Sequence, residues 1–331
     1  NYIPKMFNWF LHYFKNCNHQ SMMHTAKNMH QILSLSNDAY EEIFEEIDTT
    51  GLVEKKGIIY IWTNKNLKSR NLEIQVRKKL GIEQKLLTQK EVLDLEPNLN
   101  PVFDAGIIYE NAMHARDPHG ILKEIFRLYL KKGGKFVQTE IKNLEQKNIN
   151  ETIIKSDREE YKFEKTVVAT GAFSKKLTDQ LGEKIPLDTE RGYHVHFRKQ
   201  DHLISRPVIF LDRGFGMTPM NQGLRAVGTV ELGGLKNPLS KKRIDYILRC
   251  SKELLPQLKN HKDEWLGFRP TLPDFLPVIG PSSKFKNIIY SFGHQHLGWT
   301  LGAITGKIVS GIVSGENTNL DLQPYSSKRF N

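Results

Sequence analysis

The sequence is poor in cysteine and has no long apolar run. Cys17 and Cys250 are the two cysteines among 331 residues, and they stand far apart. They form no disulfide framework, which favours a reducing compartment, and each is best explained as a small buried side chain. No window holds 18 uninterrupted apolar residues, so no membrane-spanning helix is predicted. The best candidate, 301–313, is interrupted by Lys307 and is interpreted as a buried helix.

The chain has an excess of positive charge, +11, which suits nucleic acid or an anionic membrane surface as a partner. The lysines are scattered, however, and their small clusters fall on or beside amphipathic helices, where they are interpreted as solvated faces. Zinc-ligand spacing, RNP-like motifs and alternation of aromatic with basic residues are all absent from the sequence. Nucleic-acid binding is therefore not predicted.

Helical and strand patterns alternate along the chain. Residues 6–15 and 20–47 have helical spacing, short β runs fill 136–169, and runs of alternating polarity lie between 187 and 232. Alternating polarity is typical of a sheet with one solvated face. The pattern predicts a mixed α/β protein.

The most informative stretch is 265–300. A β run, Asn287 to Phe292, leads into Gly293-His294, and Gly298 and Thr300 follow. Where a strand ends in a glycine-rich bend that leads into a helix, several backbone N–H groups point at one spot. The helix dipole makes this spot favourable for an anion or a carbonyl-rich ring edge. The alternative is a tight turn without a ligand.

Three further segments join this stretch: KTVVATGAFS at 165–174, PLDTERGYHVHF at 186–197 and GLRAVGTVELGG at 223–234. In this order the segments resemble the FAD-dependent D-amino-acid oxidase superfamily, and most closely the bacterial D-amino-acid dehydrogenases (small subunit). The resemblance runs from about Phe7 to Gly315. It implies FAD as cofactor and hydride transfer from the α-carbon of a D-amino acid, giving a 2-oxo acid and ammonia. Two alternatives stay open: an amine oxidoreductase acting on glycine, sarcosine, proline or hydroxyproline, and a non-catalytic fragment that has lost FAD binding.

The resemblance also implies a discontinuous layout. Residues 113–184 and 270–325 would form a three-layer FAD-binding domain, and 40–112 and 185–269 a substrate domain with a mostly antiparallel sheet. The family's G-x-G-x-x-G turn, which binds the FAD pyrophosphate, is absent from this sequence. We therefore expect that an N-terminal part of a longer protein is missing and that 1–39 is a helical segment linking to it.

Arg269 is the first candidate for substrate binding. A guanidinium offers a rigid donor fork that matches a carboxylate, which lysine cannot reproduce. In the family, the arginine of this R-P motif binds the substrate α-carboxylate. The alternative is an ion pair with Asp263 or Glu264.

The resemblance assigns further residues around Arg269. Tyr193 and Glu231 would complete the substrate site, and Tyr193 and His294 would join Arg269 as catalytic residues; a half-buried strand aromatic is the alternative for Tyr193. His296 is a lower-ranked candidate for the role of His294. The predicted cofactor-binding residues are Val137, Thr170, Gly171, Gly280, Gly293, His294, Gly298, Trp299 (also suited to the core) and Thr300.

No metal site is predicted. His194 and His196 share one face of a strand, but a third ligand is not evident. A membrane quinone and oxygen are the candidate electron acceptors. A cytoplasmic location is expected, with peripheral association at the inner face of the plasma membrane left open.

Overall fold

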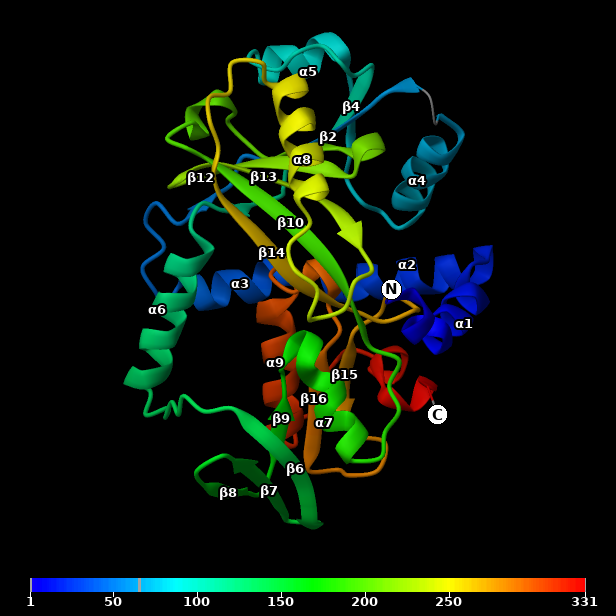
Figure 1. Ribbon diagram of the computed structural model, residues 1–331, viewed down its shortest axis with the longest axis vertical. Coiled ribbons are helices and arrows are strands. Elements are labelled where there is room, and N and C mark those ends of the chain that lie inside the picture. The colour runs from blue at the N-terminus through cyan, green and yellow to red at the C-terminus, as the bar shows by residue number, and fades with distance from the viewer. Residues whose placement is uncertain (1, 65–66, 331) are drawn as a thin grey trace.

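The computed structural model describes residues 2–64 and 67–330. The molecule is elongated, with a large sheet in one half and two smaller sheets in the other (Figure 1). Long strands β10 and β14 run from the first half toward the second, where the chain continues into β15 (Figure 1). The mixed α/β class predicted from the sequence is confirmed.

Among the described residues, eight strands form the large sheet. All neighbours are antiparallel except the parallel pair β11 and β2. In spatial order the strands are β14 (Lys262–Thr271), β10 (Asp188–Arg198), β13 (Gly223–Glu231), β12 (Phe215–Met220), β11 (Val208–Phe210), β2 (Ile58–Trp62), β4 (Ala105–Tyr109) and β3 (Lys85–Thr88). The mostly antiparallel sheet expected for the substrate half is therefore present.

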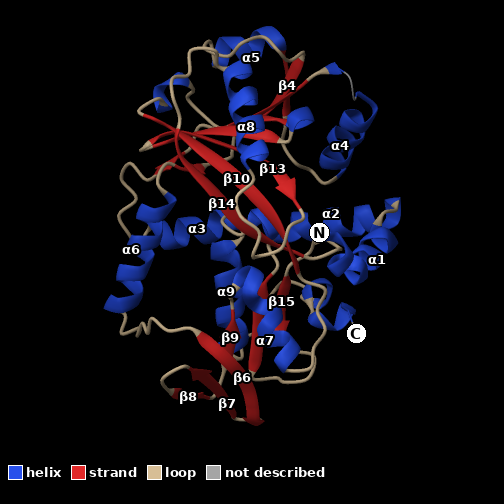
Figure 2. Cartoon of the chain, in the orientation of Figure 1, coloured by secondary structure: helices blue, strands red, loops and turns tan. Residues whose placement is uncertain are grey.

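One face of this sheet is buried under helix α8 (Lys241–Leu254), as Figure 2 shows. Side chains from alternate positions of the strands, such as Val195 and Phe197, pack with Ile244 and Ile247 of the helix in one apolar core. Helix α5 (Gln89–Leu95) closes another part of that core, and its capping box, Thr88 with Glu91, is confirmed. The opposite face of β10 is only partly buried.

The second half is organised around a three-stranded sheet of β15 (Val278–Pro281), β16 (Ile288–Phe292) and β9 (Thr166–Val168). Strands β16 and β9 are parallel, and β15 and β16 are antiparallel. Helix α7 (Ser174–Gln180) contributes to the core on this sheet, and α9 (Gly302–Ser314) packs with α3 (Ser36–Phe44) in a neighbouring core. The buried helix expected at 301–313 is thus confirmed as α9.

A third sheet, β6 (Ile141–Asn148), β7 (Glu151–Ser156) and β8 (Glu160–Phe163), lies at the far end of the molecule (Figure 1). The strand expected at Phe136–Thr139 is wrong, because this segment is irregular. Val137, predicted to flank the adenine, is 58% exposed there. β-branched and aromatic residues form a strand only where a partner strand pairs with them, and none of the described strands pairs with 136–139.

The remaining helices surround these sheets. The single helix expected at 20–47 is divided, since the chain turns between Leu33 and Ser36. Asp117 caps the helix that begins at Pro118, as its sequence predicts. The bounds of the remaining elements are α1 (Phe7–Asn16), α2 (His19–Leu33), α4 (Leu67–Lys79), α6 (Pro118–Lys131), the strand pair β1 (Val53–Glu54) and β5 (His114–Ala115), and the 3₁₀ turns η1 (Ile3–Met6), η3 (Gly171–Phe173), η4 (Asp201–Leu203), η5 (Leu211–Arg213), η6 (Gln295–Leu297), η7 (Gln323–Tyr325) and η8 (Ser327–Phe330). None of the described helices is long and apolar enough to cross a bilayer.

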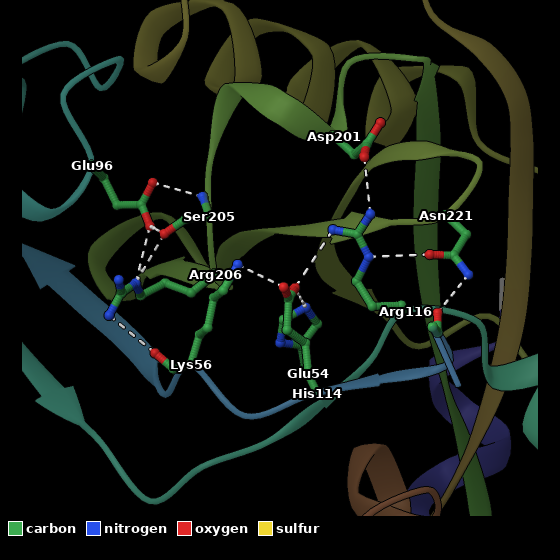
Figure 3. A network of polar contacts seen from close by, with 10 residues as sticks. Glu54, Lys56, Glu96, His114, Arg116, Asp201, Ser205, Arg206 and Asn221 are labelled. Carbon is green, nitrogen blue, oxygen red and sulfur yellow. Dashed lines mark hydrogen bonds and ion pairs between the residues drawn. The ribbon is translucent and has the colours of Figure 1, made fainter. Parts of the chain in front are cut away.

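A polar network fixes the point where the chain leaves the large sheet for α6. Figure 3 shows Glu54 facing both His114 and Arg116, each with a nitrogen 3.6 Å from a carboxylate oxygen. Arg116 also binds Asp201 at 2.9 Å. The network thus joins the β1–β5 pair to η4 through Arg116 and Asp201.

Candidate flavin and substrate site

The candidate site begins with two glycines that face each other across β10 and β14. Gly192 and Gly267 are directly paired in the register of the two strands. Neither has a side chain, so larger neighbours lie over them: the Arg269 guanidinium over Gly192 and the Trp265 indole over Gly267. A β-carbon at Gly192 would stand 2.3 Å from Arg269 Nη2. The paired glycines therefore allow the guanidinium to lie flat against the sheet.

A bulge in β13 provides the partner of this guanidinium. The register of β10 with β13 shifts between Arg191 and Tyr193, and Thr229, in the bulge, has a left-handed φ of 65°. Arg269 Nη1 donates to the Thr229 carbonyl oxygen at 3.0 Å. The Thr229 hydroxyl is buried and has no hydrogen-bond partner among the described residues. The bulge thus turns a carbonyl toward the guanidinium and leaves an unpaired hydroxyl in the same residue.

Arg269 has a depressed pKa because burial disfavours its charge, an effect that the nearby Glu190 carboxylate opposes. Burial in turn raises the pKa of Glu190, which sits opposite Arg269 in the register. The alternative partners considered from sequence are engaged elsewhere: Asp263 binds Arg198 at 2.6 Å, and Glu264 binds Lys241 at 2.6 Å. A half-buried guanidinium whose charge is only partly balanced by a neighbouring carboxylate favours an anionic ligand.

Strand β16 ends at the second part of the site. Gly293 follows with φ of +87°, and a β-carbon there would stand 2.5 Å from Leu272, so glycine is required on both counts. His294 then pairs with Thr271 at the end of β14 and lies 3.1 Å from the Thr305 hydroxyl through Nε2. Burial lowers the pKa of His294 to about 4, so its ring is neutral at physiological pH.

The helix does not open directly after this bend, as the sequence had suggested. The 3₁₀ turn η6 and a further turn intervene, and α9 begins only at Gly302. The intervening residues Gly298, Trp299 and Thr300 are exposed. The turn η6 contacts β14, the strand of Arg269, and the Arg269 charge helps, after burial, to lower the pKa of His296 in η6. Arg269 is thus near η6, which directly precedes the residues predicted to face the flavin.

Two other predicted cofactor residues adopt glycine-only backbone. Gly171 follows Thr170 after β9 with φ of +54°, in a turn whose Phe173 contacts Phe268 of β14 edge-on. Gly280 in β15 has φ of +135°. At both glycines, no atom of the described residues lies within 4 Å of the place a β-carbon would take. Glycine is therefore favoured there by the positive φ and not by a lack of space.

Tyr193 and Glu231 lie on the opposite face of the sheet from Arg269. Side chains alternate along β10, so Tyr193 points into the core under α8, while Gly192 faces the guanidinium. The Tyr193 hydroxyl donates to Glu231, which also lies 3.2 Å from the fully buried Arg191. The role of these two residues in the substrate site stays a prediction, and the structure places them on the other face from Arg269. They belong to a buried network that holds the chain after β13.

The histidine pair on β10 contacts neighbouring side chains. His196 Nε2 accepts from Arg225 Nε at 2.7 Å, and His194 stacks between His196 and Trp265. No cluster of three or more potential metal ligands occurs among the described residues. Burial is the main reason that the pKa of His194 falls to about 3.

Sequence reasoning missed Gly192, Gly267 and Thr229. The two glycines were visible in R-G-Y-H and G-F-R-P, but their pairing depends on the register of strands about 75 residues apart in the chain. Thr229 gave no signal, because a β-branched residue is disfavoured at positive φ.

The residues present fit the isoalloxazine half of a flavin. The exposed turn at 298–300 precedes a 13-residue helix with no acidic residue in its first turn, so its amides suit a ring edge that gains negative charge on reduction. The guanidinium lies beside the turn and is available to an anionic substrate. No residue of this chain is assigned to the pyrophosphate, because the sequence lacks G-x-G-x-x-G.

These features define a flavin-dependent oxidoreductase, and comparison with known proteins gives the family. The model of the DAO family, described as FAD dependent oxidoreductase, matches residues 12–312. The chain belongs to this family, and its cofactor is FAD. It is an enzyme of the FAD-dependent amino-acid oxidoreductase type.

The relatives agree in sequence and in fold. A D-amino-acid oxidase of Bradyrhizobium diazoefficiens is 30% identical over all of this chain and 80% of its own length. A D-amino acid dehydrogenase of Vibrio atlanticus is 26% identical over 99% of this chain and 80% of its own. Among solved structures, glycine oxidase from Geobacillus kaustophilus has a TM-score of 0.80 at 21% identity, over 90% of this chain and 81% of its own. L-proline dehydrogenase from P. horikoshii has a TM-score of 0.79 at 21% identity, over 90% of this chain and 82% of its own.

Proposed function

We propose that this protein oxidises D-amino acids to 2-oxo acids and ammonia. The observation that supports this most directly is the half-buried Arg269 guanidinium, held over Gly192 on β14, the strand that η6 contacts just before the exposed turn at 298–300. The names of the sequence relatives, D-amino-acid oxidase and D-amino acid dehydrogenase, support the same substrate class. We further propose that 113–184 and 270–325 form the FAD-binding half and 40–112 and 185–269 the substrate half.

In this proposal Arg269 binds the substrate α-carboxylate. Its guanidinium is preorganised by the Thr229 carbonyl at 3.0 Å, so less side-chain entropy is lost on binding. When bound, FAD supplies the acceptor for the hydride of the substrate α-carbon. His294 stays neutral because of its low pKa and therefore adds no positive charge near the substrate amine. The amine must first give up a proton, so that its lone pair forms the C=N bond as the α-hydride leaves. The resulting imino acid hydrolyses to the 2-oxo acid and ammonia.

The test uses the complete gene product loaded with FAD and an artificial electron acceptor. We expect turnover of neutral D-amino acids with equimolar 2-oxo acid and ammonia. We expect Arg269→Ala to raise KM at least tenfold, because about 2–4 kcal/mol of charge-assisted binding is lost. Arg269→Lys keeps the charge but not the fork, so we expect it to restore only a small part of the affinity.

A substrate panel separates the proposed activity from its relatives. If only glycine, sarcosine, proline or hydroxyproline is turned over, the proposal that D-amino acids are the substrates is wrong, and these amines are the substrate class. Unchanged KM in Arg269→Ala would refute the role of the arginine. Oxygen uptake, compared with reduction of a quinone analogue, would identify the electron acceptor.

A further inference from the structure

Tyr40 of α3 contacts the turn that precedes α9. Its side chain is 9% exposed, and its ring stacks on Trp299 with centroids 6.2 Å apart and planes inclined by 29°. Its hydroxyl donates a hydrogen bond to the Trp299 carbonyl oxygen. Glycine at 302 makes room for it, since a β-carbon there would stand 3.1 Å from the hydroxyl oxygen. The Gly302 N–H donates to the same oxygen at 3.2 Å, so a side chain far away in sequence and the turn itself together fix one peptide unit of the exposed turn.

That peptide unit joins Trp299 to Thr300. In a planar trans peptide the carbonyl of one residue and the N–H of the next point in opposite directions. Because Tyr40 is buried and holds the Trp299 carbonyl from the core side, the Thr300 N–H is directed away from the core. Thr300 is exposed, in the turn that follows η6, and η6 contacts β14, the strand that carries Arg269.

A hydrogen bond to a carbonyl also polarises the amide to which it belongs, which makes the attached N–H a stronger donor. Burial raises the pKa of Tyr40 to about 12. The hydroxyl is therefore protonated at neutral pH and can donate this hydrogen bond. A stronger and better oriented donor stabilises an acceptor most when that acceptor is negatively charged.

We propose that Tyr40 is a positioning residue that directs the Thr300 amide toward the flavin and so favours the reduced, more negative form of the cofactor. The inference rests on the FAD-binding turn of the proposed function and adds to it a residue outside that turn. The reduction potential of the bound flavin is its readout, since a merely structural tyrosine would not move it.

The experiment compares Tyr40→Phe with Tyr325→Phe in the complete, FAD-loaded protein. Tyr325 belongs to the same apolar core as Tyr40, and its hydroxyl likewise donates to a backbone carbonyl, that of Asn28, at 2.6 Å. Each variant removes one buried hydroxyl and keeps the ring, so both lose a similar amount of stability. We measure the midpoint potential of the flavin, the FAD dissociation constant and Tm.

We expect Tyr40→Phe to weaken binding of reduced flavin about fivefold relative to oxidised flavin. For a two-electron couple this lowers the potential by about 20 mV. Tyr325→Phe should lower Tm and leave the potential at the wild-type value. The inference is overturned if Tyr40→Phe leaves the potential unchanged or if Tyr325→Phe shifts it equally. A wild-type protein that binds no flavin would overturn the proposed function and this inference together.

Discussion

The sharpest consequence of the site geometry concerns Gly192. Replacing it with alanine puts a β-carbon 2.3 Å from Arg269 Nη2, 2.4 Å from Cζ and 2.8 Å from Nε. Such contacts are impossible, so one of the groups must move. The guanidinium is the free end of a flexible side chain, whereas the alanine is part of the backbone of a central strand, so the guanidinium moves.

The cost falls on binding and not on folding. A displaced guanidinium loses its place beside Thr229 and its bidentate approach to a carboxylate. We expect this loss of charge-assisted hydrogen bonding to weaken substrate binding by about 2–3 kcal/mol. At about 1.4 kcal/mol per factor of ten this corresponds to a 30- to 150-fold rise in KM. Alanine in a strand is more favourable than glycine by about 0.5–1 kcal/mol, so Tm should not fall.

The assay is steady-state kinetics of Gly192→Ala with a neutral D-amino acid, together with thermal unfolding. Gly216→Ala is the matched control: it lies in β12 of the same sheet, and its β-carbon would clash only with the flexible end of Ile209, at 2.4 Å. We expect this control to keep KM within about threefold. If Gly192→Ala also kept its wild-type KM with a normal Tm, the result would refute the idea that Arg269 binds the substrate carboxylate from its place over Gly192.

Three further outcomes follow from buried polar groups. His194 and His294 have folded pKa values of about 3 and about 4, below the ordinary 6.5. The unfolded chain therefore binds more protons, and we expect urea titrations to show about 1.5 kcal/mol lost per histidine between pH 6.5 and 5. In His194→Gln the loss over this interval should be smaller by about 1.5 kcal/mol. Tyr193→Phe removes the hydrogen bond to Glu231 and should lower the unfolding free energy by about 1–2 kcal/mol, with KM unchanged. Glu183, 1% exposed, accepts from Ser282, Ser283 and Tyr290, and Glu183→Gln should cost about 2–3 kcal/mol in the same titrations.

Local signals in the sequence predicted local structure well. The Asp117-Pro118 pair and the Thr88 capping box begin helices as expected, because cap chemistry depends on residues only three or four positions apart. Arg269 was found because Gly267-Phe268 before it and Pro270 after it place it in a recognisable motif. These features need no knowledge of what packs against them.

The failures depend on partners far away in the chain. The segment around Val137 has strand-forming residues but no partner among the described strands, so propensity alone misled. The glycine-rich bend after β16 was expected to open directly into a helix, but a turn at 298–301 intervenes, whose Trp299 carbonyl accepts from Tyr40. Neither contact can be read from the residues on either side of the segment itself.

The assignment of Tyr193 shows the same limit most clearly. The alternation along β10 was visible in the sequence, with His194 and His196 on one side and Tyr193 on the other. Which side faces α8 is decided only when the helix, about 50 residues later, packs on the sheet. Because the helix covers the Tyr193 side, the proposed site uses the opposite side, where a position without a side chain makes room for Arg269. In this proposal the substrate-binding surface depends on two glycines as much as on the arginine that lies over one of them.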